Sequence, residues 1–245
     1  IKSIGGVRSV VASETYLAPQ TAEEDDSSSV VYNDTFVYKT GIYDSSEFLE
    51  EYSGQGTTVA ILDTGLDYTH PAFQKQPEDL SKLALTRDDV ENAVANKDLS
   101  ASKMFARTGD ALTADDLFIS NKIPFAYDYA DNDADVYPSY SNHGTHVAGI
   151  VGGNDDSYTD KDGNLVDEPF IGVAPNTQLV ICKVFTDNLD AIALGGAETE
   201  SIIAALEDCV KLGVDVINMS LGSAAGFSDT ADGDDEGDYL NRVYE

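Results

Sequence analysis

The sequence predicts an α/β fold in which a mainly parallel sheet is flanked by helices. Short apolar runs, typical of strands buried on both faces, recur at 59–62, 179–184 and 214–219. Helical patterns lie between them, and the clearest is the amphipathic segment 200–212, which ends at Gly213. Strands that alternate with helices of ten or more residues are typical of parallel sheets with helices on their faces.

The first strong strand, Val59–Leu62, leads directly into Asp63 and the small-residue turn Thr64-Gly65. In open parallel sheets, reactive groups gather at the carboxyl ends of the strands, where the connections leave a crevice. We therefore expect Asp63 to lie at the reactive edge of the sheet. Taken alone, an aspartate in this position is better explained as a structural cap of the turn.

The next 45 residues, 77–121, are charged and irregular, with one short helix predicted at 88–97. A long excursion between two structured motifs usually belongs to the surface rather than to the core. We expect this segment to be a surface insertion.

The heptapeptide His143–Gly149 holds two of the three histidines of the chain. Residues 139–142 offer helix-capping side chains, so His143 is predicted to lie in the first turn of a buried helix. Imidazole is the usual general base near neutral pH, and it needs a carboxylate to fix its tautomer. Asp63 is the candidate carboxylate.

Other interpretations of the histidines remain open at this point. His143 fits a polar helix cap, and His143 with His146 could bind a metal. The zinc helix motif, however, has two histidines four residues apart with a glutamate between them, and this segment has neither feature. His70 is predicted to be a structural turn residue.

Composition excludes several partners. Acidic residues outnumber basic ones by 45 to 14, for a formal net charge of −31. Nucleic acids and anionic membranes bind clusters of Lys and Arg, so neither is expected as a partner. We expect no membrane insertion, because no apolar stretch approaches the ~20 residues of a spanning helix.

Cys182 and Cys209 are too few for a disulfide framework, and we interpret them as buried free thiols.

Together, four segments resemble the subtilisin-like serine proteases, and the order of Asp before His is that of subtilisin. The resemblance covers roughly residues 54–230 and rests on 59–67, 143–149, 172–175 and 215–222. It implies a three-layer subtilisin-like fold, of which this chain carries the N-terminal half. It also implies that His143 is the general base, that Asp63 orients it, and that His146 is structural.

The resemblance extends to the substrate. Ser220, Leu221 and Gly222 would bind an extended polypeptide as an added strand, and Gly195 and Gly196 would form the opposite wall of the groove. Residues 1–20 are similar to the end of an inhibitory pro-peptide, which would make the pro-peptide a second partner. Residues 21–40 would be an acidic linker, or maturation zone, and 41–245 the N-terminal part of the catalytic domain. Residues 122–131 resemble the lactocepin-type bacterial cell-envelope proteinases, which implies a secreted or cell-wall-associated bacterial protein.

The sequence also departs from the family pattern. The nucleophilic serine and the oxyanion-hole asparagine have no counterpart before Glu245, so we expect them beyond residue 245 and expect this segment alone to be inactive. Ala72-Phe73 stands where relatives carry a calcium-binding aspartate, and the loop 160–164 lacks a closing glutamate. We expect no cofactor in catalysis and leave structural calcium open. The alternative function is a non-catalytic, subtilase-like binding module at the cell surface.

Overall fold

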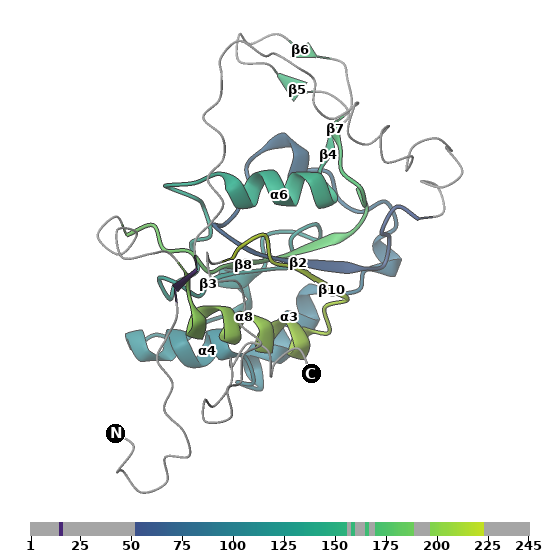
Figure 1. Ribbon diagram of the computed structural model, residues 1–245. Helices are drawn as coiled ribbons and strands as arrows, with labels where there is room; N and C mark the ends of the chain where they lie inside the picture. The colour runs from purple at the N-terminus through teal and green to yellow at the C-terminus, as the bar shows by residue number, and fades with distance from the viewer. Residues whose placement is uncertain are drawn as a thin grey trace, which may run out of the picture.

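The computed structural model describes residues 15–16, 52–155, 158–159, 165–166, 170–188 and 197–222. Within these residues the main sheet has four strands in the order β10-β2-β8-β3, and every neighbouring pair is parallel (Figure 1). The bounds are β2 (Thr58–Asp63), β3 (Phe125–Asp128), β8 (Gln178–Lys183) and β10 (Val216–Asn218). The parallel sheet predicted from the sequence is confirmed.

Helices cover both faces of this sheet, which gives three layers (Figure 1). α6 (His143–Gly152) lies on one face. α8 (Thr199–Leu212) lies on the other, with α3 (Arg87–Ala95) and α4 (Ser100–Phe105). Successive side chains of a strand point to opposite faces. Accordingly, Ile61 and Ile181 pack in the core cluster under α6, whereas Leu62 and Cys182 pack in the cluster on the side of α8.

The segment 77–121 is not the surface excursion that the sequence suggested. It contains η2 (Leu80–Lys82), α3 (Arg87–Ala95), α4 (Ser100–Phe105), η3 (Ala106–Thr108) and α5 (Ala114–Leu117). Buried apolar side chains from this segment join the same core cluster as α8, namely Leu85, Val90, Leu99, Ala101, Leu112, Ala114 and Leu117. The expectation failed because helices of four to nine residues are too short to display a clear apolar period.

The buried side chain of Gln178 fastens both ends of the part 84–121 of this segment to β8. Its Nε2 donates to the carbonyl oxygens of Leu85 (2.7 Å) and Asn121 (2.8 Å), and its Oε1 accepts from the backbone N–H groups of Ala84 and Leu85. Both ends of this part of the chain are therefore attached to the same residue of the sheet.

Helix α8 agrees closely with its predicted range, 200–212. It ends at Gly213, whose φ of 71° is the left-handed conformation that favours glycine. One turn before that end, the fully buried carboxylate of Asp208 accepts hydrogen bonds from Ser100 N (2.6 Å), Ala101 N (2.8 Å) and the Tyr129 hydroxyl (3.0 Å). Asp208 thus satisfies the first N–H groups of α4 and fixes α8 against it.

Three antiparallel pairs of two-residue strands complete the described structure. They are β1 (Thr15–Tyr16) with β9 (Ala197–Glu198), β4 (Asn154–Asp155) with β7 (Phe170–Ile171), and β5 (Tyr158–Thr159) with β6 (Leu165–Val166). Most of the expected pro-peptide end and linker (1–14 and 17–40), the loop 160–164 and Gly195-Gly196 lie outside the described residues. Among the helices described, none is long and apolar enough to span a bilayer.

Candidate active site

Asp63 and His143 are in direct contact, although 80 residues separate them in the sequence. Nδ1 of His143 lies 2.8 Å from Oδ1 and 3.0 Å from Oδ2 of Asp63. Asp63 is the last residue of β2, and His143 is the first residue of α6. The Asp63 side chain is only 1% exposed, whereas that of His143 is 12% exposed. The contact joins a buried acid to an imidazole that reaches the solvent.

The direction of this hydrogen bond follows from the chemistry of the two groups. An ionised carboxylate only accepts, so Nδ1 of a neutral imidazole carries the hydrogen and Nε2 is left as the acceptor. A histidine with a free Nε2 lone pair and a carboxylate behind it is equipped to take a proton from a weak nucleophile.

The surroundings of Asp63 hold its carboxylate in place. Burial raises the pKa of Asp63, while hydrogen bonds from His143 and from the backbone N–H of Thr64 (2.7 Å) act in the opposite direction. One carboxylate oxygen therefore has two donors. This arrangement fixes the carboxylate plane and, through it, the imidazole.

The hydroxyl group of Thr64, directly after β2, bonds to the backbone on both sides of His143 at the start of α6. Its hydroxyl donates to the carbonyl oxygen of Ser141 (2.8 Å) and accepts from the backbone N–H of Gly144 (2.9 Å). Sequence reasoning identified Thr64 only as part of a small turn. Its position directly after Asp63 was the only local signal of this role.

A buried lysine supports the same turn from the neighbouring strand. Lys183, the register partner of Asp63 on β8, is 2% exposed. Its ammonium contacts the carboxylate of Asp128 and lies 3.1 Å from that of Asp187 and 3.5 Å from that of Asp131. Burial by itself would lower the pKa of Lys183, but the adjacent Asp128 and Asp187 carboxylates hold that pKa above its ordinary value. No local pattern in the sequence indicates this cluster.

The stem of Lys183 also lies under Gly65. Gly65 has a φ of 106°, and a β-carbon at this position would lie 3.0 Å from Cδ of Lys183 and 2.3 Å from the carbonyl oxygen of Val136. Only glycine fits this turn without moving its neighbours. The turn after Asp63 is thus packed between β8 and the loop that leads to His143.

Of the residues expected to bind substrate, those that the structure describes lie at the same edge of the sheet as Asp63. Asn218 of β10 pairs with Ile61 of β2, so Ser220 and Asp63 each lie two residues beyond a matched pair. Ser220, Leu221 and Gly222 are half-buried, and the Ser220 hydroxyl donates to Oδ1 of Asn218 (3.0 Å). Gly195 and Gly196 lie just outside the described residues, immediately before β9.

The other two histidines lie outside this contact. His70 begins η1 (Pro71–Phe73), where its Nδ1 accepts from the backbone N–H of Ala72 at 3.2 Å, as a turn residue does. The backbone N–H of His146 donates to the carbonyl oxygen of Asn142 within the first turn of α6. In the part of the chain that the structure describes, no three His, Cys, Asp or Glu side chains are grouped to hold a metal.

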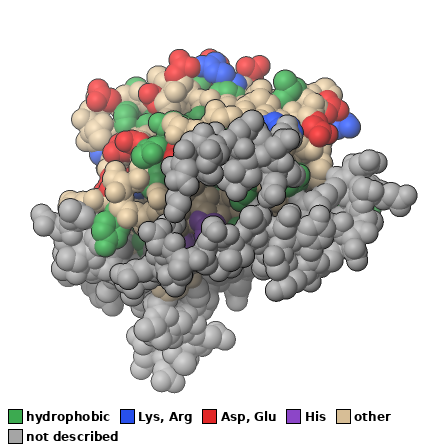
Figure 2. Space-filling model, turned by 90° about the horizontal axis from the view of Figure 1, so that it is seen from above, with side chains coloured by type: hydrophobic (Ala, Val, Ile, Leu, Met, Phe, Trp, Pro, Cys, Tyr) green, Lys and Arg blue, Asp and Glu red, His purple; other side chains and the backbone are tan. Residues whose placement is uncertain are grey.

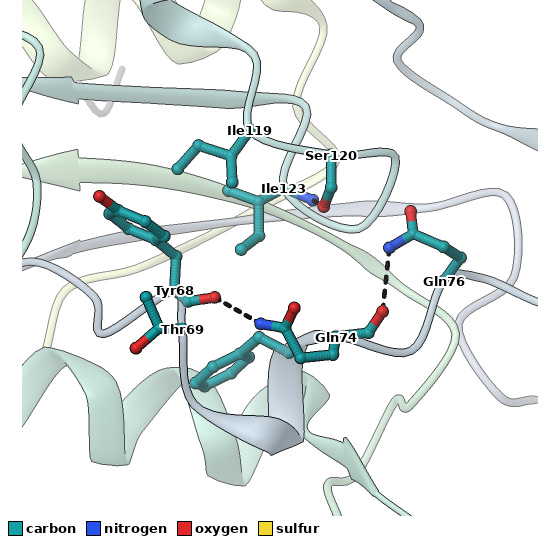
Figure 3. Close-up of a pocket in the computed structure, with 8 residues that line it drawn as sticks. Tyr68, Thr69, Gln74, Gln76, Ile119, Ser120 and Ile123 are labelled. Carbon is teal, nitrogen blue, oxygen red and sulfur yellow. Dashed lines mark hydrogen bonds between the residues drawn. The ribbon is translucent and has the colours of Figure 1, made fainter.

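A separate pocket of about 250 Å³ lies between η1 and the loop at 119–123 (Figure 3). Tyr68, Gln74 and Gln76 line it on one side, and Gln74 Nε2 donates to the carbonyl oxygen of Tyr68 (2.7 Å). Neither Asp63 nor His143 lines this pocket. In the view from above the molecule, a histidine side chain is visible, and most of the charged side chains in view lie along one margin (Figure 2).

Comparison with known proteins places this site in a family. The model of the subtilase family matches residues 54–244, and the chain belongs to that family. The family predicted from the four sequence segments is therefore confirmed.

Individual relatives show which proteins of the subtilase family this chain resembles. The chain is 33% identical over 230 residues to the PII-type proteinase of Lacticaseibacillus paracasei, covering 92% of this chain and 10% of that protein. It is equally identical over 233 residues to the PI-type proteinase of Lactococcus lactis subsp. cremoris. The C5a peptidase of Streptococcus pyogenes is 28% identical over 70% of this chain and 12% of its own length. The predicted likeness to cell-envelope proteinases is confirmed, and the chain spans about a tenth of the proteinases' length.

Among solved structures, fervidolysin from Fervidobacterium pennivorans, described as a keratinolytic enzyme related to subtilisin, matches with a TM-score of 0.42 and 21% identity. The match covers 76% of this chain and 20% of that one.

Proposed function

We propose that this chain is the Asp- and His-bearing part of a secreted or cell-wall-associated serine endopeptidase. His143 acts as the general base, Asp63 orients it, and a serine outside these 245 residues is the nucleophile. No cofactor enters this chemistry. Membership of the subtilase family and the named proteinases among the relatives support this function.

The contact between Asp63 and His143 is the observation that carries the proposal. In the reaction, Nε2 of His143 removes the proton from the serine hydroxyl as the oxygen attacks the peptide carbonyl. The imidazolium that forms is stabilised by the buried Asp63 carboxylate, and it then protonates the leaving amine. The 2.8 Å bond to Nδ1 is the geometry that this sequence of steps needs.

The substrate is proposed to be an extended polypeptide that pairs with the segment at Ser220, Leu221 and Gly222. Its other edge would meet the segment that carries Gly195 and Gly196. A polypeptide bound between two such segments adds a strand through main-chain hydrogen bonds, and side-chain pockets then select its sequence.

The pro-peptide is proposed to use this same mode of binding. The pairing of Thr15 and Tyr16 with Glu198 and Ala197, antiparallel and immediately after Gly196, supports this proposal. Residues near the end of the pro-region would then occupy the substrate groove until the acidic linker at 21–40 is cleaved.

The function is tested on the full-length precursor, matured and then treated with a fluorophosphonate probe. We expect labelling of one serine in the wild type and none in a His143→Ala variant. A His146→Ala variant is the matched control and should keep its labelling. Absence of labelling in the matured wild type, or labelling that survives His143→Ala, would favour the alternative of a non-catalytic binding module.

A further inference from the structure

The two cysteines of the chain lie against each other in the core. Sγ of Cys182 is 3.8 Å from Sγ of Cys209, and both side chains are fully buried. Cys182 belongs to β8 and Cys209 to α8, so the two thiols face each other across the boundary between the sheet and one helical layer. The proposed catalysis uses neither thiol.

We propose that Cys182 and Cys209 form a disulfide when the protein folds in an oxidising compartment. This inference does not depend on the proposed protease function. In the structure both are buried free thiols, as expected from the sequence, and the proposal concerns their state after folding under oxidising conditions.

Both cysteines are held by rigid surroundings that keep them together. Cys182 lies in the register of the sheet between Leu62 of β2 and Tyr127 of β3. Cys209 follows Asp208, whose carboxylate accepts from two backbone N–H groups of α4 and from the Tyr129 hydroxyl and so fixes that turn of α8. A disulfide needs an S–S distance of about 2.05 Å, so the sulfurs must approach by roughly 1.8 Å, shared between two side chains.

Within these 245 residues the partners are unambiguous, because Cys182 and Cys209 are the two cysteines they contain. Bond formation removes two protons and two electrons from the two thiols. An oxidised dithiol oxidoreductase or a small disulfide accepts them and is released as thiols. Burial raises the pKa of the Cys182 thiol, so the thiolate that starts this exchange is scarce once the core has closed. The bond should therefore form during folding and then be protected.

The bond would close a loop between residues 27 apart, and that loop carries Gly195 and Gly196. Cross-linking a loop of this size restricts the unfolded chain and stabilises the native one. Both ends of the segment with the proposed groove wall would then be tied to the core.

The test is a thiol count on the full-length protein, secreted without reductant. The protein is unfolded directly in guanidinium with N-ethylmaleimide, digested and weighed. We expect the two cysteine peptides to be linked, with no adduct, and each to take one adduct after reduction. Two adducts without reduction, or a cysteine linked to a small thiol, would overturn the proposal.

Thermal unfolding gives a second measurement on the same protein. Reductant should lower the melting temperature of the wild type by roughly 5 to 10 °C. The double variant Cys182→Ala/Cys209→Ala should show no such shift. An equal decrease in the melting temperature of both proteins would show that the reductant does not act through a disulfide between these cysteines.

Discussion

A β-carbon on Gly144 would lie 2.3 Å from the carbonyl oxygen of Gly65. These residues follow His143 and Asp63 by one and two positions, so the closest approach of α6 to the end of β2 occurs beside the proposed catalytic pair. The absence of a side chain at Gly144 is what lets the helix come near enough for the 2.8 Å bond between Asp63 and His143.

Gly144→Ala is therefore expected to separate the pair. The added methyl group clashes with backbone, which cannot rotate away, so α6 must move and the hydrogen bond of His143 lengthens. We expect kcat/KM of the matured full-length enzyme to fall at least 100-fold, since small displacements of catalytic groups cost that much. Gly149→Ala, in the same helix, is the control: its β-carbon would meet only the ring of Phe170 at 3.4 Å. Equal activities of the two variants would contradict this account.

Asp63→Asn tests the role of the buried carboxylate. The amide keeps the shape of the side chain but loses its charge and favours the wrong imidazole tautomer. We expect kcat to fall on the order of 10⁴-fold with little change in melting temperature. The measurement is single-substrate kinetics with a peptide reporter. Activity above a tenth of the wild-type value would show that Asp63 does not orient His143.

Lys183→Met tests the ammonium that lies among three carboxylates. Without its charge, the buried Asp128 loses its partner and faces Asp131 and Asp187. We expect a loss of about 3 to 5 kcal/mol in the free energy of unfolding, measured by denaturant titration. Lys82→Met, which removes an exposed ion pair with Asp79, should leave this free energy almost unchanged, because solvent screens the pair. Similar losses in both variants would refute a special role for Lys183.

Lys122 is expected to make the stability of the folded protein depend on pH, and the direction of this dependence follows from its pKa. Its fully buried ammonium donates to the carbonyl oxygens of Pro175 (2.8 Å) and Thr177 (2.7 Å), and burial lowers its pKa to about 7. In the unfolded chain the pKa is about 10.4. Between these values the unfolded state binds more protons than the folded one, so this group makes stability rise with pH from about 7 to about 10.

The measurement compares wild type with Lys122→Met across that range. The variant lacks the titrating group and removes one donor from each of two carbonyl oxygens, which lowers its stability by a constant amount. The stability difference between the two proteins should widen as pH rises from 7 to 10 and stay level from 5 to 6. A constant difference throughout would rule out the lowered pKa.

The proposed inhibitory strand can be tested with a peptide. A peptide of residues 1–20 should inhibit the matured full-length enzyme competitively. Replacing Thr15 and Tyr16 together with proline removes the backbone donor that this two-residue strand directs at β9 and should weaken inhibition at least tenfold. Replacing both with alanine keeps the donor and is the control. Inhibition unaffected by the proline changes would place the peptide elsewhere.

Local patterns predicted the elements that carry the proposed pair. The apolar run before Asp63, the capping residues before His143 and the glycine after Leu212 each have a signal within a few residues, and β2, α6 and α8 begin or end close to the predicted positions. β3 was missed because Phe125–Asp128 is a four-residue strand with no turn signal of its own.

The supporting contacts were missed for a different reason. The Thr64 hydroxyl meets residues 77 and 80 positions away, and Lys183 meets Asp128 across 55 positions. No periodicity or spacing encodes such pairs, because they exist only once the strands are side by side. Sequence reasoning reached the proposed catalytic pair through a family pattern, whereas its support needed the fold.

The attachment of residues 84–121 to Gln178 has an evolutionary consequence. This segment packs on the sheet face opposite α6, and a single side chain holds its two ends. Lineages can exchange or lengthen it, provided that its apolar residues still cover that face, without disturbing the geometry of Asp63 and His143. It is also a natural place for an engineer to graft a targeting module that leaves cleavage chemistry intact.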